Sequence, residues 1–218
     1  MQQKIKLVIF DLDGTLVDAY KAVASSVNYS LGTMGYPPVD DDTIKRLVGW
    51  GDRNLIQNFV REEEIDKILS IYRQHHAAAL KAGTVFLPGA KELLNKLKKS
   101  DYSLAIASNR PTRFTHIILK HLKIGGYFKH VLCADKVENA KPAPDLLIQI
   151  LERFQLSPEE ALYVGDMAID VETGQGANVR TVAVVTGSST KEEIMSLNPF
   201  KVIRNVGEVA GIIEGLRE

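Results

Sequence analysis

Close to its N-terminus the chain reads Leu7-Val8-Ile9-Phe10-Asp11-Leu12-Asp13-Gly14-Thr15-Leu16-Val17-Asp18. Its first four residues are an apolar run, and we expect a strand over residues 4–10. A short apolar run that stops at an acidic, glycine-containing stretch is typical of a strand buried on both faces of a parallel sheet. The stretch therefore predicts an α/β fold.

Similar apolar runs recur along the chain and predict further strands at residues 102–107, 131–134, 161–164, 181–185 and 201–203. Amphipathic helical patterns lie between them, with apolar residues on one face. Strands that alternate with helices imply right-handed crossovers and a parallel sheet covered on both faces. The sequence predicts a doubly wound parallel sheet with a Rossmann-like core.

Residues 17–83 break this alternation, because they contain helical patterns and no convincing strand. We interpret them as a helical cap domain inserted after the first strand, with residues 1–16 and 84–218 forming the core. The connections at 15–18 and 82–87 would be hinges. An insert at this point lies over the carboxyl ends of the strands, where open α/β sheets bind ligands.

Composition narrows the class of protein. The 218 residues include 27 basic and 27 acidic side chains, so the formal net charge is zero and gives no footprint for nucleic acid. The single cysteine excludes an intramolecular disulfide framework, the polar start does not resemble a signal peptide, and no apolar stretch approaches the roughly 20 residues of a membrane span. We expect a cytoplasmic monomer or homodimer that acts on a small molecule, without nucleic-acid or membrane partners.

Polar residues follow three of the predicted strands directly: Asp11 and Asp13, then Ser108 and Asn109, then Asp166 and Asp170. The carboxyl ends of parallel strands lie at one edge of the sheet, so these groups can converge on one site. Alone, an Asp-x-Asp pair is usually a solvated turn. The following Gly14-Thr15 and the acid at another strand end favour a site.

Asp11 and Asp13 face the same side of an extended backbone and repel each other unless a cation or a proton joins them. With Asp166 they form an oxygen-donor set that suits Mg²⁺ and not Zn²⁺. A carboxylate can attack phosphorus, so we interpret Asp11 as a nucleophile and Asp13 as a general acid and base. Backbone N–H groups near Gly14 and Thr15 could bind phosphate oxygens.

Three further positions have both a functional and an ordinary interpretation. Ser108 and Asn109 can donate hydrogen bonds to phosphate, or can form a turn or helix cap. Lys141, held extended by the following proline, can offset the carboxylates or be a surface lysine. Asp170 can bind Lys141 or a metal-bound water, or can be an acid in a first helical turn.

Together these motifs resemble the haloacid dehalogenase-like hydrolase superfamily. The matching pieces are Asp11-Leu-Asp-Gly-Thr-Leu-Val-Asp18, Ser108-Asn109, Lys141-Pro-Ala-Pro-Asp145 and Gly165-Asp-Met-Ala-Ile-Asp170. The resemblance implies a C1-type cap, and it implies a role for each matching residue. Asp11 would be the nucleophile and a metal ligand, Asp13 the acid/base with its carbonyl on Mg²⁺, Ser108 and Lys141 the phosphoryl-binding groups, and Asp166 and Asp170 the rest of the metal site.

Within this superfamily the chain is similar to phosphoglycolate phosphatases, which implies hydrolysis of a small phosphate monoester through an aspartyl-phosphate. A beta-phosphoglucomutase-like sugar phosphomutase and a non-catalytic phosphate-binding protein remain alternatives. We expect substrate choice to reside in the cap, where Trp50, Arg53 and Arg46 would meet the leaving group. A packing Trp and a solvated Arg are the ordinary alternative. His75 and His76 lie on a cap helix without a partner pattern, and we expect no site there.

Overall fold

A computed structural model describes residues 4–216, so residues 1–3 and 217–218 of the predicted core lie outside the described residues. Six parallel strands form the main sheet, in the order β5-β4-β1-β6-β7-β8. They are β1 (Leu7–Phe10), β4 (Ser103–Ser108), β5 (His130–Cys133), β6 (Ala161–Gly165), β7 (Arg180–Val184) and β8 (Lys201–Ile203). The predicted doubly wound parallel sheet is confirmed, and the strand bounds differ from the predicted ones by a few residues at most.

Helices cover both faces of this sheet, because alternate residues of each strand point to opposite sides. Val8 and Phe10 pack on one face, against apolar residues of α5 (Ala90–Lys99), α6 (Thr112–His121) and α10 (Val209–Gly215). Leu7 and Ile9 pack on the other face, against α7 (Asp145–Phe154). The helices α8 (Ala168–Gly176) and α9 (Lys191–Ser196) pack beside β7. The unbroken apolar run in β1 is thus explained by burial on both sides.

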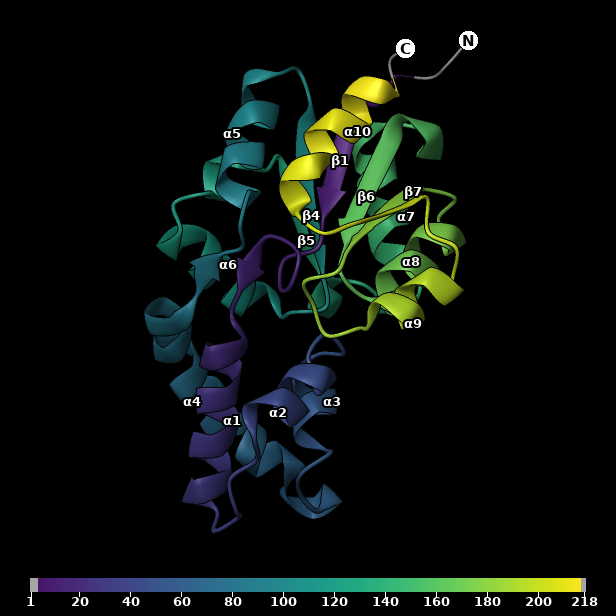
Figure 1. Ribbon diagram of the computed structural model, residues 1–218. Helices are drawn as coiled ribbons and strands as arrows, with labels where there is room; N and C mark the ends of the chain where they lie inside the picture. The colour runs from purple at the N-terminus through teal and green to yellow at the C-terminus, as the bar shows by residue number, and fades with distance from the viewer. Residues whose placement is uncertain (1–3, 217–218) are drawn as a thin grey trace.

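The first four helices after β1 form a separate body below the carboxyl edge of the sheet (Figure 1). They are α1 (Tyr20–Thr33), α2 (Asp41–Leu47), α3 (Asp52–Ile56) and α4 (Ile65–Gly83). They have their own apolar core, in which Val27 of α1, Ile44 of α2 and Ile68 of α4 are buried. We call residues 17–83 the cap from here on.

Two short strands join the cap to the core. β2 (Val17–Asp18) pairs antiparallel with β3 (Val85–Phe86), at the two segments where we expected hinges. The expectation of no strand after residue 17 is therefore wrong at Val17–Asp18. A pair of two-residue strands carries too weak an alternation to be recognised in a sequence.

The short helical turns of the chain are Glu62–Glu64, Gly125–Tyr127, Ala134–Lys136, Pro158–Glu160 and Val206–Glu208. Among the residues that the structure describes, no helix has the length and apolarity needed to cross a membrane.

Candidate active site

The predicted site residues meet where three adjacent strands end. β1 lies between β4 and β6 in the sheet, so the segments that follow these strands are neighbours. A pocket of about 50 Å³ opens there. Its wall includes Asp11, Asp13, Ser108, Arg110 and Lys141 from the core, and Val48, Gly49, Leu55 and Tyr72 from the cap. The pocket is therefore small and lies between the two parts of the chain.

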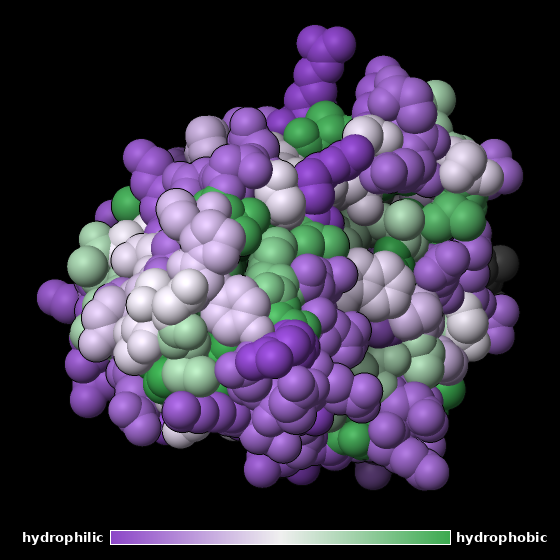
Figure 2. Space-filling model, turned by 90° about the horizontal axis from the view of Figure 1, so that it is seen from below, coloured by the Kyte–Doolittle hydropathy of each residue, from purple (hydrophilic) through white to green (hydrophobic). Residues whose placement is uncertain are grey.

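The cap end of the molecule is mostly polar on its surface. Figure 2 shows this face, where hydrophilic residues dominate and hydrophobic ones appear between them in small patches.

Lys141 binds the first acidic residue of the site. Its Nζ donates hydrogen bonds to Oδ1 of Asp11 and to Oδ1 of Asp170, each over 2.7 Å. It also contacts the hydroxyl of Tyr163 at 3.2 Å, and that hydroxyl donates to Asp170 over 2.6 Å. One buried ammonium group thus links two carboxylates that come from different strand ends.

The charges of this group are strongly perturbed. Burial raises the pKa of Asp11 to about 7, although the attraction of Lys141 opposes the rise. Burial acts to lower the pKa of Lys141, but Asp11 and Asp170 outweigh it, and the pKa lies well above 10.5. Burial, and then repulsion by Asp170 and Asp11, raise the pKa of Asp166 well above 3.8. If all three acids of this group ionise, they carry more negative charge than Lys141 alone can neutralise.

Asp170 supports the site from the start of α8. Its Oδ2 accepts hydrogen bonds from the backbone N–H groups of Asp166 and Met167, both over 3.0 Å. Asp166 precedes α8, which begins at Ala168, and Asp170 lies in its first turn. Asp170 caps this turn and binds Lys141, so both of its oxygens already accept hydrogen bonds.

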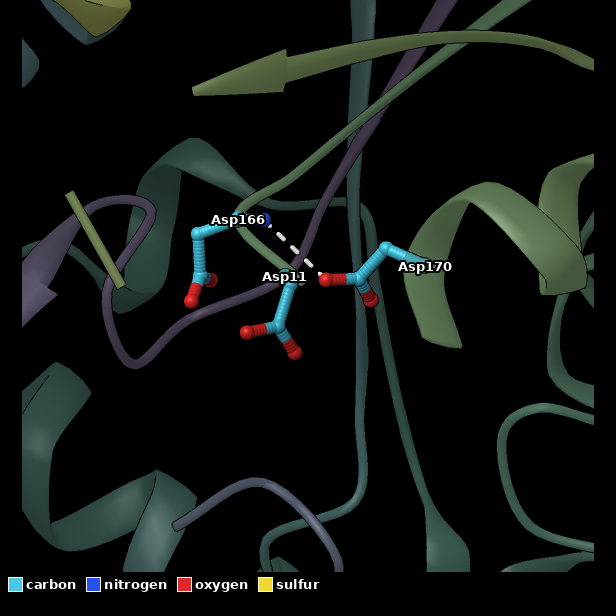
Figure 3. A group of neighbouring side chains, drawn as sticks. All are labelled: Asp11, Asp166 and Asp170. Carbon is cyan, nitrogen blue, oxygen red and sulfur yellow. Dashed lines mark hydrogen bonds between the residues drawn. The ribbon is translucent and has the colours of Figure 1, made fainter. Parts of the chain in front are cut away.

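Asp166 carries an unused oxygen, which is the main sign of a cation site. Its Oδ1 accepts a hydrogen bond from the hydroxyl of Thr15 over 2.7 Å, whereas its Oδ2 is buried without a partner among the described residues. Asp11, Asp166 and Asp170 offer carboxylate oxygens that lie within 4.8 Å of one another (Figure 3). An all-oxygen donor set with an orphaned oxygen fits a hard cation such as Mg²⁺.

Two glycines give Asp166 its space. A Cβ on Gly187 would lie 1.5 Å from Oδ2 of Asp166, and a Cβ on Gly14 would lie 2.4 Å from the same oxygen. Gly14 also has a φ of +80°, which side-chain-bearing residues rarely adopt. No larger residue fits at either position with Asp166 where it is.

Asp13 is paired with a different cation from Asp11. Arg110 donates to both of its oxygens, from Nε over 2.6 Å and from Nη2 over 2.9 Å. The third nitrogen of the guanidinium, Nη1, lies 2.8 Å from Nε2 of His76 in α4. Arg110 is 9% exposed and His76 is fully buried. The second acid of the site is thus held by a contact between core and cap.

His76 is neutral in this arrangement. Burial, and then the positive charge of Arg110, lower its pKa to about 2. Because Arg110 can only donate, Nε2 of His76 accepts and Nδ1 carries the proton. Nδ1 lies 3.0 Å from Oγ of Ser26, which donates to the carbonyl of Ala22 over 2.8 Å. The hydrogen bonds run from α1 through α4 to Asp13 without a break.

The structure places the other predicted ligand-binding residues as follows. Ser108 lines the pocket, at the end of β4. Asn109 lines it too, but its amide donates to the carbonyls of Gly49 and Lys141 and accepts from the N–H of Lys141, all over 3.0 Å. Gly14 and Thr15 lie beside Asp166 and are not among the lining residues. Their contribution to phosphate binding stays a prediction.

The predicted specificity residues of the cap lie away from the pocket. Trp50 is 44% exposed, and Arg53 is an exposed side chain that forms an ion pair with Asp66. Arg46 donates to the carbonyl of Ser188 over 3.0 Å and binds the core from outside. None of the three is among the pocket-lining residues. Residues in a loop can be assigned to a site by sequence, but the directions of their side chains depend on packing.

Sequence reasoning missed Arg110 and His76. Arg110 directly follows the Ser-Asn pair at the end of β4, which was a usable signal for a site residue. His76 continues the buried stripe of α4 formed by Ile68, Tyr72 and Leu80, so its position on the buried face was also readable. The contact between them joins residues from cap and core, and no local pattern indicates it.

The similarity to known proteins extends beyond the motifs to most of the chain. Residues 8–184 match the family model described as haloacid dehalogenase-like hydrolase. The chain is 31% identical to phosphoglycolate phosphatase 1 of Pseudomonas aeruginosa, over 94% of this chain and 78% of that protein. It is 32% identical to a phosphoglycolate phosphatase of Psychrobacter arcticus, over 89% of each.

Solved structures agree with these relatives. A structure from Haemophilus somnus, described as a predicted phosphoglycolate phosphatase, has a TM-score of 0.92 and 25% identity, and the match covers 97% of this chain and 99% of that one. A structure described as a predicted phosphatase from Clostridium acetobutylicum has a TM-score of 0.87 at 25% identity, with 98% and 100% covered. The cap and the core are both included in these matches.

Proposed function

Because this chain belongs to the haloacid dehalogenase-like hydrolase family, we propose that it is a Mg²⁺-dependent phosphatase of phosphoglycolate or a similarly small phosphate monoester. The observation that carries the proposal is the arrangement around Asp11. One of its oxygens is bound by Lys141, and the carboxylate lines the pocket beside the orphaned oxygen of Asp166. The names of the relatives supply the choice of phosphoglycolate.

Asp11 and Asp166 would hold the cation, together with the backbone carbonyl of Asp13. Asp170 would support them, because its two oxygens already bind Lys141, Tyr163 and two backbone N–H groups. The cation supplies positive charge that offsets the negative charge of the carboxylates and of the phosphoryl group. Lys141, which lies between Asp11 and Asp170, supplies further positive charge.

The reaction has two steps in this proposal. A carboxylate oxygen of Asp11 attacks phosphorus while the bond from phosphorus to the ester oxygen breaks, and Asp13 donates a proton to that oxygen. Asp13 then removes a proton from water, which attacks phosphorus and releases Asp11 and inorganic phosphate. Ser108, at the pocket wall, would donate a hydrogen bond to a phosphoryl oxygen.

Hydrolysis is favoured over the mutase alternative by the relatives, which are described as phosphoglycolate phosphatases. The predicted cytoplasmic location and the oligomeric state stay predictions.

The test is phosphate release from a panel of small phosphate esters by wild type and by Asp11→Asn. We expect wild type to release phosphate with Mg²⁺ and to lose the activity with EDTA. The variant should lose it under all conditions. Brief mixing with a substrate whose phosphoryl group is radioactive should label the wild-type protein and not the variant.

The matched control is Asp101→Asn, the same change at an exposed acid before β4. It should keep full activity. Wild-type protein without phosphatase activity would instead favour a phosphate-binding protein, and conversion of a sugar phosphate to its isomer would favour a mutase.

A further inference from the structure

Arg110 is the one pocket-lining cation, among the residues described, that does not bind the metal-site carboxylates. Lys141 is fully engaged by Asp11 and Asp170. The acid that the cap contributes to the wall, Asp52, is paired outside the pocket with Arg73, at 2.7 and 3.0 Å. Among the described residues of this wall, Arg110 is therefore the cation that can bind a negative charge on the leaving group of a substrate.

Arg110 has more donors than Asp13 and His76 accept. A guanidinium has five N–H donors. Two point at the oxygens of Asp13 and one at His76, which leaves two donors without a partner among the described residues. The planar fork of a guanidinium matches a carboxylate, so a second carboxylate can bind the remaining donors.

The position of Arg110 fits a leaving group and not the phosphoryl group. It follows the phosphoryl-side residues Ser108 and Asn109 in the chain, and it contacts the residue that would protonate the ester oxygen. Asp13 and Arg110 both line this pocket, so a carboxylate one carbon from that oxygen would lie in the same cavity as the guanidinium. His76 fixes the guanidinium from the cap side, and its neutral ring accepts an N–H and does not repel it.

We propose that Arg110, held in place by Asp13 and His76, recognises a carboxylate on the leaving group and makes the enzyme selective for short phosphate esters that carry one. The inference rests on the proposed phosphatase function and assigns its specificity to a core residue that neither the motifs nor the relatives' names indicate. It also replaces the predicted role of Arg53, whose guanidinium is exposed and paired with Asp66.

The experiment compares kcat/KM for phosphoglycolate and for 2-hydroxyethyl phosphate, which carries a hydroxymethyl group in place of the carboxylate. We expect wild type to prefer phosphoglycolate about 100-fold, because a site built for a charged partner rejects an analogue that lacks it. In Arg110→Met the preference should fall by at least about tenfold, and Arg110→Lys should keep part of it. The intrinsic reactivities of the two esters cancel when variants are compared.

Arg113→Met is the matched control, because it removes an exposed arginine from the same region of the chain. Its preference should equal that of wild type, and Arg53→Met should behave in the same way. An unchanged preference in Arg110→Met, or a loss of preference in Arg53→Met instead, would overturn the inference.

The failure of this inference is distinguishable from failure of the proposed function. If wild type hydrolyses no ester, the function fails before any variant is measured. If wild type is active and the preference does not depend on Arg110, only the inference fails. Should Arg110→Met not fold, as judged by circular dichroism, Arg110→Lys decides: a fall of about threefold or more supports the inference, and no change overturns it.

Discussion

Asp11 and Asp13 are two residues apart, yet each is paired with a different cation from a different part of the molecule. Asp11 is bound by Lys141. The other partners of Lys141, which are Asp170 and Tyr163, also belong to the core. Asp13 is bound by Arg110, which is in turn bound by His76 of the cap. The half of the site that would attack phosphorus is thus complete without the cap, whereas the half that would handle the leaving group is not.

The first way to test this contrast is to remove the cation of the core half. In Lys141→Met, two buried carboxylates lose their partner, so we expect kcat/KM to fall by about 1,000-fold or more and stability to fall by about 3 kcal/mol. Activity assays and urea unfolding measure the two effects. Lys136→Met, at an exposed lysine, is the control and should change neither. Full activity in Lys141→Met would show that Asp11 does not need this cation.

The second test acts on the cation site through a residue that has no side chain. In Gly187→Ala the new Cβ would meet Oδ2 of Asp166, so the carboxylate must move. We expect the Mg²⁺ concentration for half-maximal activity to rise about tenfold or more, with the fold retained. Gly211→Ala has open space around it and serves as the control. An unchanged Mg²⁺ requirement would mean that Asp166 is not a ligand.

The third test concerns the cap half and depends on pH. The pKa of His76, about 2 in the folded protein, lies below its ordinary 6.5, so the unfolded chain binds a proton below pH 6.5 that the folded chain does not. Stability that is present above pH 6.5 is therefore lost progressively as the pH falls toward 2.

Urea unfolding of wild type and His76→Gln measures this loss. Between about pH 7.5 and pH 5.5, the stability of wild type relative to the variant should fall by about 1 kcal/mol. The partners that face His76 (Arg110, Tyr72, Ser26 and His75) are the same in both proteins. His121→Gln, the same change at an exposed histidine of α6, is the matched control. A pH-independent difference for His76→Gln would mean that folding does not lower the pKa of His76.

The smallest effect is expected at Arg53. In Arg53→Ala an exposed ion pair with Asp66 is lost, and such pairs contribute at most about 1 kcal/mol. Selectivity across small phosphate esters should stay within about twofold of wild type. A larger change in the ratio of kcat/KM values would mean that Arg53 contacts the substrate and that the cap determines substrate choice.

The core half of the site was predictable and the cap half was not, for a physical reason. Asp11, Ser108 and Asp166 each follow an apolar strand directly, and parallel strand ends share one edge, so their convergence follows from the order of elements. The partners of Asp13 come from a loop after β4 and from the middle of α4. Their meeting depends on how the cap sits against the core, which no spacing within either part encodes. For the same reason Trp50 and Arg53 were assigned to the pocket although they are not among the residues that line it.

Asn109 joins these two halves through one amide group. It donates to the carbonyl of Gly49 in the cap, and it is bound twice to the backbone of Lys141. The bond to Gly49 ties the cap to the core, whereas the two bonds to Lys141 lie within the core. If the cap moved away, only the first bond would be lost. Under the proposed mechanism, the ammonium group would then stay beside a phosphorylated Asp11 while the alcohol left and water entered.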